Sequence, residues 1–308
     1  MSVQIVIQQM LMILILIGTG YILKKTNKIK SSVSKDLSAL VVNVCNPAII
    51  ITSALQRDSS VTGRSLLYAA AAAFVMYVFL VVVGKVMPVL LKIPFKDRNS
   101  YNMMCVFGNT GFIGIPLVSA LVGAQALIYV AVTNIFFYLL IYTYGIHLVA
   151  RDSGTKEKFQ VKNLLNTGNL ATLLAILLFL GEWKFPPLAE ETLDYMGGAT
   201  TFLAMIVIGI TIADTPIHTL FTEKKIYFFT VLRFLVLPIG IGLGLKWFIK
   251  DSTLLDTLVI MAAVPAGNMP LMLMMERGMD GKLLSKGIII STLASVITIP
   301  LVLVAVCA

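Results

Sequence analysis

The residues with the most chemical potential in this sequence are amides that stand beside glycines and prolines within long apolar segments. Asn109 lies in GNTGFIGIP and Asn268 lies in VPAGNMP. An amide offers a hydrogen-bond donor and an acceptor without the cost of a buried charge. Proline removes a backbone donor and glycine permits unusual dihedral angles, so both segments are predicted to break as helices near their centres.

Each break would leave backbone groups without partners inside an apolar surrounding. Such groups are tolerated only where they line a cavity or pack on protein. The N-terminus of a half-helix also carries N–H donors and a partial positive charge, which favours an anion. We therefore predict that the two breaks form an anion site with the candidate binding residues Asn109, Thr110, Gly111, Gly267 and Asn268. The alternative is that each proline and glycine only kinks an ordinary helix, which each asparagine then caps.

Other polar residues inside apolar segments are weaker candidates. Asn46 precedes Pro47 in NPAIIITSAL, where a binding role and a simple kink with interhelical hydrogen bonds are equally compatible with the pattern. Asn134 and Tyr138 stand one helical turn apart and could also contact a substrate. Arg233 is a charged residue inside an apolar segment, so it could attract or gate an anion, or instead reach the interface or form a structural pair.

The residues that the sequence lacks narrow the chemistry further. No Asp or Glu stands at the centre of an apolar segment, and the cysteines Cys45, Cys105 and Cys307 have no metal-binding spacing. No phosphate-binding loop, nucleophile elbow or metal-binding His/Glu motif occurs, so neither an enzyme nor an ATP-driven pump is expected. We predict no cofactor and no metal, and leave open a coupling ion, either H⁺ or Na⁺ bound by carbonyl and amide oxygens.

The elements that position these residues are predicted to be membrane-spanning helices. The chain is 58% hydrophobic and 13% charged, with a mean hydropathy of +0.93, so lipid is the expected solvent. Ten apolar stretches are long enough to span a bilayer: 3–23, 36–55, 65–87, 99–121, 127–149, 163–181, 192–212, 226–246, 254–276 and 287–306.

The Lys and Arg residues between these stretches predict the orientation. Eighteen lie in or beside the odd-numbered connections and five in or beside the even-numbered ones, which places the first group in the cytoplasm and both termini outside. The basic charge therefore indicates membrane orientation and not nucleic-acid binding. Two five-helix halves, residues 1–151 and 152–308, would have opposite orientations, and the broken helix is the fourth in each.

Four segments together resemble the auxin efflux carrier family, which belongs to the same superfamily as the bile acid:sodium symporters. They are GNTGFIGIPL, AVPAGNMPL, NPAIIITSAL and VLRFLVLP. The resemblance implies an all-α membrane protein with an inverted repeat, a scaffold (helices 1, 2, 6 and 7) and a transport domain (helices 3–5 and 8–10) that moves as an elevator. It also implies a crossing of helices 4 and 9, with crossover prolines at Pro116 and Pro270 and an additional helix-9 break at Pro265, and a homodimer formed through the scaffold.

These observations predict a secondary transporter of small organic anions in the cell membrane. The short connection between helices 5 and 6 resembles bacterial or archaeal members of the family. The candidate substrates are monocarboxylates and dicarboxylates, auxin-like or malate- and malonate-like. The alternatives are a sodium-coupled symporter of bile-acid-like anions and a membrane sensor that binds a ligand without moving it.

Overall fold

The computed structural model describes residues 3–30, 32–55, 62–153, 165–214 and 223–307, which are mostly helical. The first part of the chain forms α1 (Val3–Lys25), α2 (Ser32–Leu40), α3 (Asn46–Leu55), α4 (Gly63–Leu90), α5 (Arg98–Val106), α6 (Ile115–Leu121), α7 (Leu127–Leu140) and α8 (Ile146–Ser153). The second part forms α9 (Thr167–Gly181), α10 (Pro187–Asp214), α11 (Lys224–Val231), α12 (Leu237–Lys246), α13 (Ser252–Ala263), α14 (Met269–Glu276) and α15 (Lys282–Cys307). Single π-helical turns join α2 to α3, α7 to α8 and α11 to α12 into continuous helices.

Within these ranges, seven helices are long and apolar enough to cross a membrane. Three further apolar helices are shorter: Thr110–Leu121, Thr167–Gly181 and Ser252–Ala263. Two of the three belong to the stretches that were predicted to break, and their shortness follows from the break itself. The ten-span arrangement and the division at residue 151 stay predictions.

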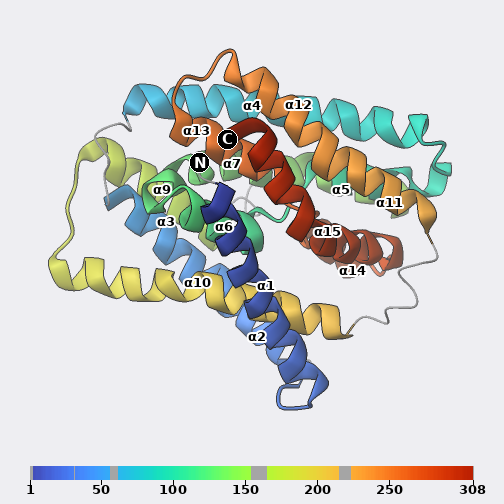
Figure 1. Cartoon of the computed structure of the whole chain (residues 1–308), viewed down its shortest axis with the longest axis horizontal. Coiled ribbons are helices and arrows are strands. Elements are labelled where there is room, and N and C mark those ends of the chain that lie inside the picture. Colours follow the sequence, from blue (N-terminus) through green and yellow to red (C-terminus); the bar gives the residue numbers. More distant parts are fainter. Residues whose placement is uncertain (1–2, 31, 56–61, 154–164, 215–222, 308) are drawn as a thin grey trace.

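Close backbone contact fixes α1 against α10, which cross in Figure 1. A Cβ atom on Gly209 would lie 2.1 Å from the carbonyl oxygen of Ile17, and one on Gly20 would lie 2.4 Å from that of Ile206. Glycine is therefore required at both positions. Small residues allow this approach in membranes, where packing and not hydrophobicity drives helix association.

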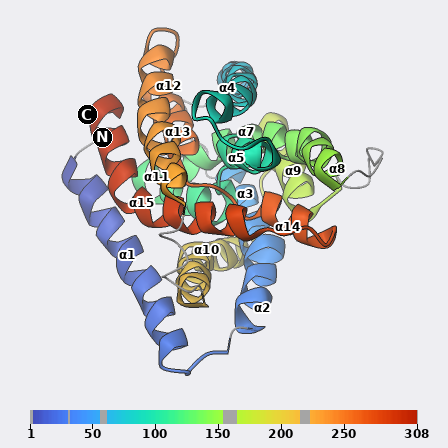
Figure 2. The same ribbon diagram turned by 90° about the vertical axis from the view of Figure 1, so that its right-hand side faces the viewer.

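The buried side chains form two apolar cores. One lies among α1, α3, α9, α10 and the first part of α7, and the other among α4, α5, α8, α11 and the first part of α15. Figure 2 shows α2 and α10 on one side of α15, and α4, α5 and α12 on the other. Val264 belongs to the first core, while Phe107 and Ala266 belong to the second, so the cores meet where α5 and α13 end.

The start of α1 and the end of α15 lie near each other in both views (Figures 1 and 2). This agrees with termini on one side of a membrane, although the side itself stays a prediction. Four of the residues counted for orientation, Arg57, Lys156, Lys158 and Lys162, lie outside the described residues.

Replacing Gly209 tests the α1–α10 contact. Gly209→Ala is expected to lower the apparent melting temperature by about 5 °C or more, because the new methyl group overlaps the backbone of α1. Gly198→Ala on the same helix is the control, since a Cβ there meets nothing within 4 Å. Equal melting temperatures for the two purified variants would contradict the packing described.

Candidate functional site

The two interrupted helices meet at their breaks. α5 ends at Val106 and the chain becomes extended at Phe107, while α13 ends at Ala263 and becomes extended at Val264. Gly108 and Ala266 form an isolated antiparallel backbone pair. The N–H of Asn109 donates to the carbonyl oxygen of Pro265 at 2.7 Å, and the N–H of Gly267 donates to that of Phe107 at 2.8 Å. Each break thus satisfies backbone groups of the other, as groups in an apolar interior require.

Glycine allows the two backbones to approach this closely. A Cβ atom on Gly267 would lie 2.7 Å from the carbonyl oxygen of Gly108. A Cβ atom on Gly108 would lie 2.7 Å from a methyl carbon of Val264. The contact at Gly267 is with backbone, so any other residue there would force the crossing apart, whereas a side chain at Gly108 would first displace the side chain of Val264.

Arg233 joins the ends of both half-helices. Its side chain is 1% exposed, and it lies in the π-helical turn between α11 and α12. Nε donates to the carbonyl oxygen of Cys105 at 2.6 Å, and Nη1 donates to that of Ala262 at 2.8 Å. These carbonyls belong to the last turns of α5 and α13, where carbonyl oxygens have no N–H donor within their own helix. The guanidinium also lies over the ring of Phe234, 4.8 Å from its centroid.

This contact decides between the structural alternatives for Arg233. The side chain stays buried beside the breaks, so it does not reach toward the interface. It is the one buried charged side chain in the described part of the chain, and the helix ends it contacts carry partial negative charge. Its part in attracting or gating an anion stays a prediction.

Ser291 in α15 provides a further partner that the sequence patterns did not single out. Its Oγ accepts from the N–H of Ala266 at 3.1 Å and donates to the carbonyl oxygen of Ile288 at 3.0 Å. The side chain is fully buried. The available signal was a hydroxyl residue within an otherwise apolar helix, which many spans contain for simpler reasons.

The crossing leaves two helix N-termini beside each other. The helical segment Thr110–Leu121 begins directly after one break, and α14 begins after the other. Asn109 caps the first, because its Oδ1 accepts from the N–H of Phe112 at 3.1 Å. Asn268 occupies the cap position of α14 without a side-chain cap hydrogen bond and is half-buried. The carbonyl ends of α5 and α13, which carry partial negative charge, bond to Arg233. The N-termini of Thr110–Leu121 and α14 carry partial positive charge.

Other predicted site residues flank the first break. Thr110 is buried and its N–H donates to the carbonyl oxygen of Gly108, while Gly111 is half-buried. From α3, Nδ2 of Asn46 lies 3.4 Å from the carbonyl oxygen of Gly111, at the long end for a hydrogen bond. Oδ1 of Asn46 is buried without a partner. Asn46 and Pro47 therefore lie beside the crossing, with an amide oxygen still able to accept a hydrogen bond.

The remaining candidates, Asn134 and Tyr138, both lie on α7, outside the two interrupted helices. Asn134 is 3% exposed and its Oδ1 has no partner. Tyr138 stacks on Tyr142 with ring centroids 6.5 Å apart, and its hydroxyl lies beside Gly168 at the start of α9. These contacts fix where both side chains lie, and their roles in binding stay predictions.

The prolines differ in their relation to the crossing. Pro265 supplies a carbonyl to the backbone bridge itself. Pro270 stands in the first turn of α14 and Pro116 in the first turn of α6, a π-helical turn beyond the first break. No group of three or more His, Cys, Asp or Glu side chains capable of holding a metal occurs among the residues described.

Several apolar spans with two interrupted helices joined at their breaks define a multi-span membrane protein of the transporter class. A family model described as "Membrane transport protein" matches residues 5–162 and 153–303. The chain belongs to this family, the auxin efflux carrier family that its motifs resemble.

Three relatives agree with this assignment. An uncharacterized transporter of Methanothermobacter thermautotrophicus is 23% identical over 303 residues, covering 96% of this chain and 96% of its own length. An uncharacterized transporter of Methanocaldococcus jannaschii is 26% identical over 304 residues, which cover 94% of this chain and 96% of that protein. A protein of Rhizobium meliloti named "Putative malonate transporter" is 24% identical over 206 residues, covering 63% and 62%.

Replacing Arg233 tests its role in holding the crossing. Arg233→Met is expected to lower the free energy of unfolding by roughly 2 kcal/mol or more, because two buried carbonyls lose their donor. Arg233→Lys should fall between this variant and the wild type, since an ammonium lacks the planar fork. Thermal unfolding in detergent measures both. Arg64→Met, at an exposed position, is the control, and an Arg233→Met variant as stable as this control would contradict the assignment.

Proposed function

We propose that this protein is a secondary transporter of small organic anions, with carboxylates as the substrate class. The observation that carries the proposal is the pairing of two helix N-termini at the crossing, with Asn109 and Asn268 at their cap positions. Backbone N–H groups and the helix dipoles attract a carboxylate, while amides donate hydrogen bonds to it. Membership in a transporter family and a relative named for malonate support the same substrate class.

Burial of the opposite helix ends makes this site selective for negative charge. Arg233 lies against the carbonyl ends of α5 and α13, which would otherwise attract cations. Asn46 adds an amide from α3, and its unpartnered Oδ1 could accept a hydrogen bond from a protonated carboxyl or hydroxyl group of the substrate. An anion would therefore contact both the crossing and the helix beside it.

Transport would proceed by an elevator-like movement of one group of helices past another. The proposed scaffold comprises α1, α2, α3, α9 and α10, in which α1 packs on α10 and α3 packs on both α9 and α10. The proposed transport domain contains α4–α8 and α11–α15, including the crossing. Because backbone hydrogen bonds join the two breaks, these helices would move as one body. Ten spans, an inverted repeat, extracytoplasmic termini and a scaffold-mediated homodimer complete the proposal.

Two other functions use the same geometry. A sodium-coupled symporter would place Na⁺ among the carbonyl and amide oxygens of the breaks, and a sensor would bind the anion without moving it. Transport of a small carboxylate is favoured over the symporter because the described residues include no buried carboxylate to bind a cation. It is favoured over the sensor because the chain belongs to a family of membrane transport proteins.

Alanine substitution at the crossing tests the proposed site. Asn109→Ala, Asn268→Ala and Asn46→Ala are each expected to lower malonate uptake into proteoliposomes by about tenfold or more, because a hydrogen bond to a charged group is lost. Asn99→Ala is the matched control, since that amide bonds to Asp152 at the other end of α5. Unchanged uptake in all three variants, with the protein folded, would refute the site.

Thermal stability in the presence of ligands distinguishes the coupling alternatives. A bound carboxylate is expected to raise the melting temperature of the purified protein, because it binds the folded state and not the unfolded one. Malonate, malate, an indole carboxylate and a bile acid would be compared in sodium and in choline buffers. Equal shifts in both buffers support transport without sodium, while a shift that requires sodium supports the symporter.

A further inference from the structure

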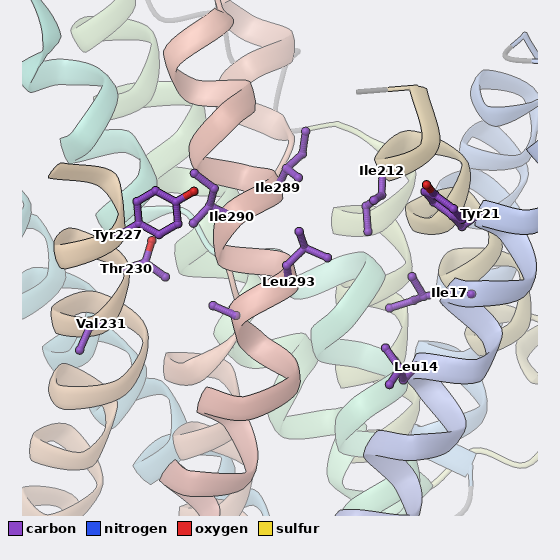
Figure 3. Close-up of a pocket in the computed structure, with 12 residues that line it drawn as sticks. Leu14, Ile17, Tyr21, Ile212, Tyr227, Thr230, Val231, Ile289, Ile290 and Leu293 are labelled. Carbon is purple, nitrogen blue, oxygen red and sulfur yellow. The ribbon is translucent and has the colours of Figure 1, made fainter. Parts of the chain in front are cut away.

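A large cavity lies between two pairs of helices, and the residues that line it are not those of the crossing. It has a volume of about 740 Å³ and is lined by α1 and α10 on one side and by α11 and α15 on the other (Figure 3). Its walls include Leu14 and Ile17 of α1, and Ile290 and Leu293 of α15. Leu14 and Leu293 are more than two-fifths exposed, so the cavity opens at the outer surface of the helices.

The cavity wall is almost entirely apolar, with a few hydroxyl groups. Thr230 of α11 is 3% exposed and its Oγ1 has no hydrogen-bond partner. Tyr21 and Tyr227 carry the other hydroxyls, on α1 and α11 (Figure 3). The Oγ1 of Thr230 is fully buried, so it offers no contact to a ligand in the cavity, whose lining is otherwise apolar apart from the two tyrosines.

Basic residues gather at one end of the cavity. This end of the cavity lies toward the ends of α1 and α10 and the starts of α11 and α15. One lining residue on each helix marks this end of the cavity: Tyr21, Ile212, Tyr227 and Ile289. Five lysines and two acidic residues lie within four positions of them along the sequence: Lys24, Lys25, Lys224, Lys225 and Lys286, with Asp214 and Glu223. Lys24 pairs with Asp214 at 3.2 Å, and Lys25 lies over the ring of Tyr21. The net charge at this end is positive.

We propose that this cavity binds one anionic phospholipid. An acyl chain fills the apolar part between α1 and α15, and the phosphate lies against Lys25 and Lys224. Both lysines are exposed and stand one turn beyond Tyr21 and Tyr227. A cavity that is apolar along its length and basic at one end matches the order of groups in such a lipid.

The position of the cavity gives the lipid a place in the function. α1 and α10 belong to the proposed scaffold, and α11 and α15 belong to the proposed transport domain. A lipid at this boundary would occupy the space between the scaffold and the transport domain, whose shape would change as the transport domain moves. Binding itself does not depend on transport, so the two proposals fail separately.

Filling the cavity tests the acyl-chain site. Gly18 lines the cavity and a Cβ there meets nothing within 4 Å, so Gly18→Phe places a ring in the cavity without a backbone clash. Gly240→Phe is the control, because that glycine also meets nothing within 4 Å but lies on α12 outside the cavity. Native mass spectrometry with phosphatidylglycerol should show one retained lipid for the wild type and the control, and none for Gly18→Phe.

Neutralising the lysines tests the phosphate site. The wild type is expected to prefer phosphatidylglycerol over phosphatidylcholine of the same acyl chains, by about fivefold for each lysine engaged. Lys25→Gln with Lys224→Gln should remove this preference, whereas Lys35→Gln with Lys96→Gln, at exposed positions elsewhere, should keep it. Equal binding of both lipids by the wild type, or a lipid retained by Gly18→Phe, would overturn the proposal.

Discussion

The contact between one guanidinium and two carbonyl groups is the constraint on which the site depends. α5 and α13 both end in the apolar interior, where their last carbonyls cannot reach water. Arg233 donates to one carbonyl from each, and the breaks then bond to each other through Asn109 and Gly267. The charge is acceptable because the negative ends of two helices surround it. Without this donor, the last carbonyls of α5 and α13 would be buried with no hydrogen-bond partner from Arg233.

The same arrangement separates the two polarities of the broken helices. Their carbonyl ends are occupied by protein, so the N–H ends remain available at the crossing beside Asn46 and Asn268. In the proposed function, selectivity for an anion would arise because the carbonyl ends of the broken helices are neutralised by Arg233, and not because a basic side chain contacts the substrate. The proposed carboxylate site would therefore need no second buried cation beside Arg233, the one buried charged side chain among the residues described.

Local features of the sequence predict local breaks well and long-range partners poorly. The Gly-Asn and Pro-Ala-Gly-Asn segments correctly predicted that the helices at 99–121 and 254–276 are interrupted. The sequence marked Arg233 as unusual but did not identify its partners, because Cys105 lies 128 residues away and offers only a backbone carbonyl. Ser291 was missed for a similar reason. The sequence indicated Pro265 only as an additional break in its helix, whereas its carbonyl oxygen accepts a hydrogen bond from Asn109 across the crossing. The pattern of side chains does not show which backbone carbonyl will lack an N–H donor. That depends on how the two interrupted helices are placed in the fold.

The burial of Arg233 also has an electrical consequence. If the helices that carry the crossing move across the bilayer as proposed, this fixed positive charge moves with them. A monovalent anion at the crossing would balance this buried charge, whereas the unloaded helices would carry it through the field uncompensated. A membrane potential contributes about 2.3 kcal/mol per charge for each 100 mV. Voltage would then act on the return of the empty carrier more strongly than on the step that carries the substrate.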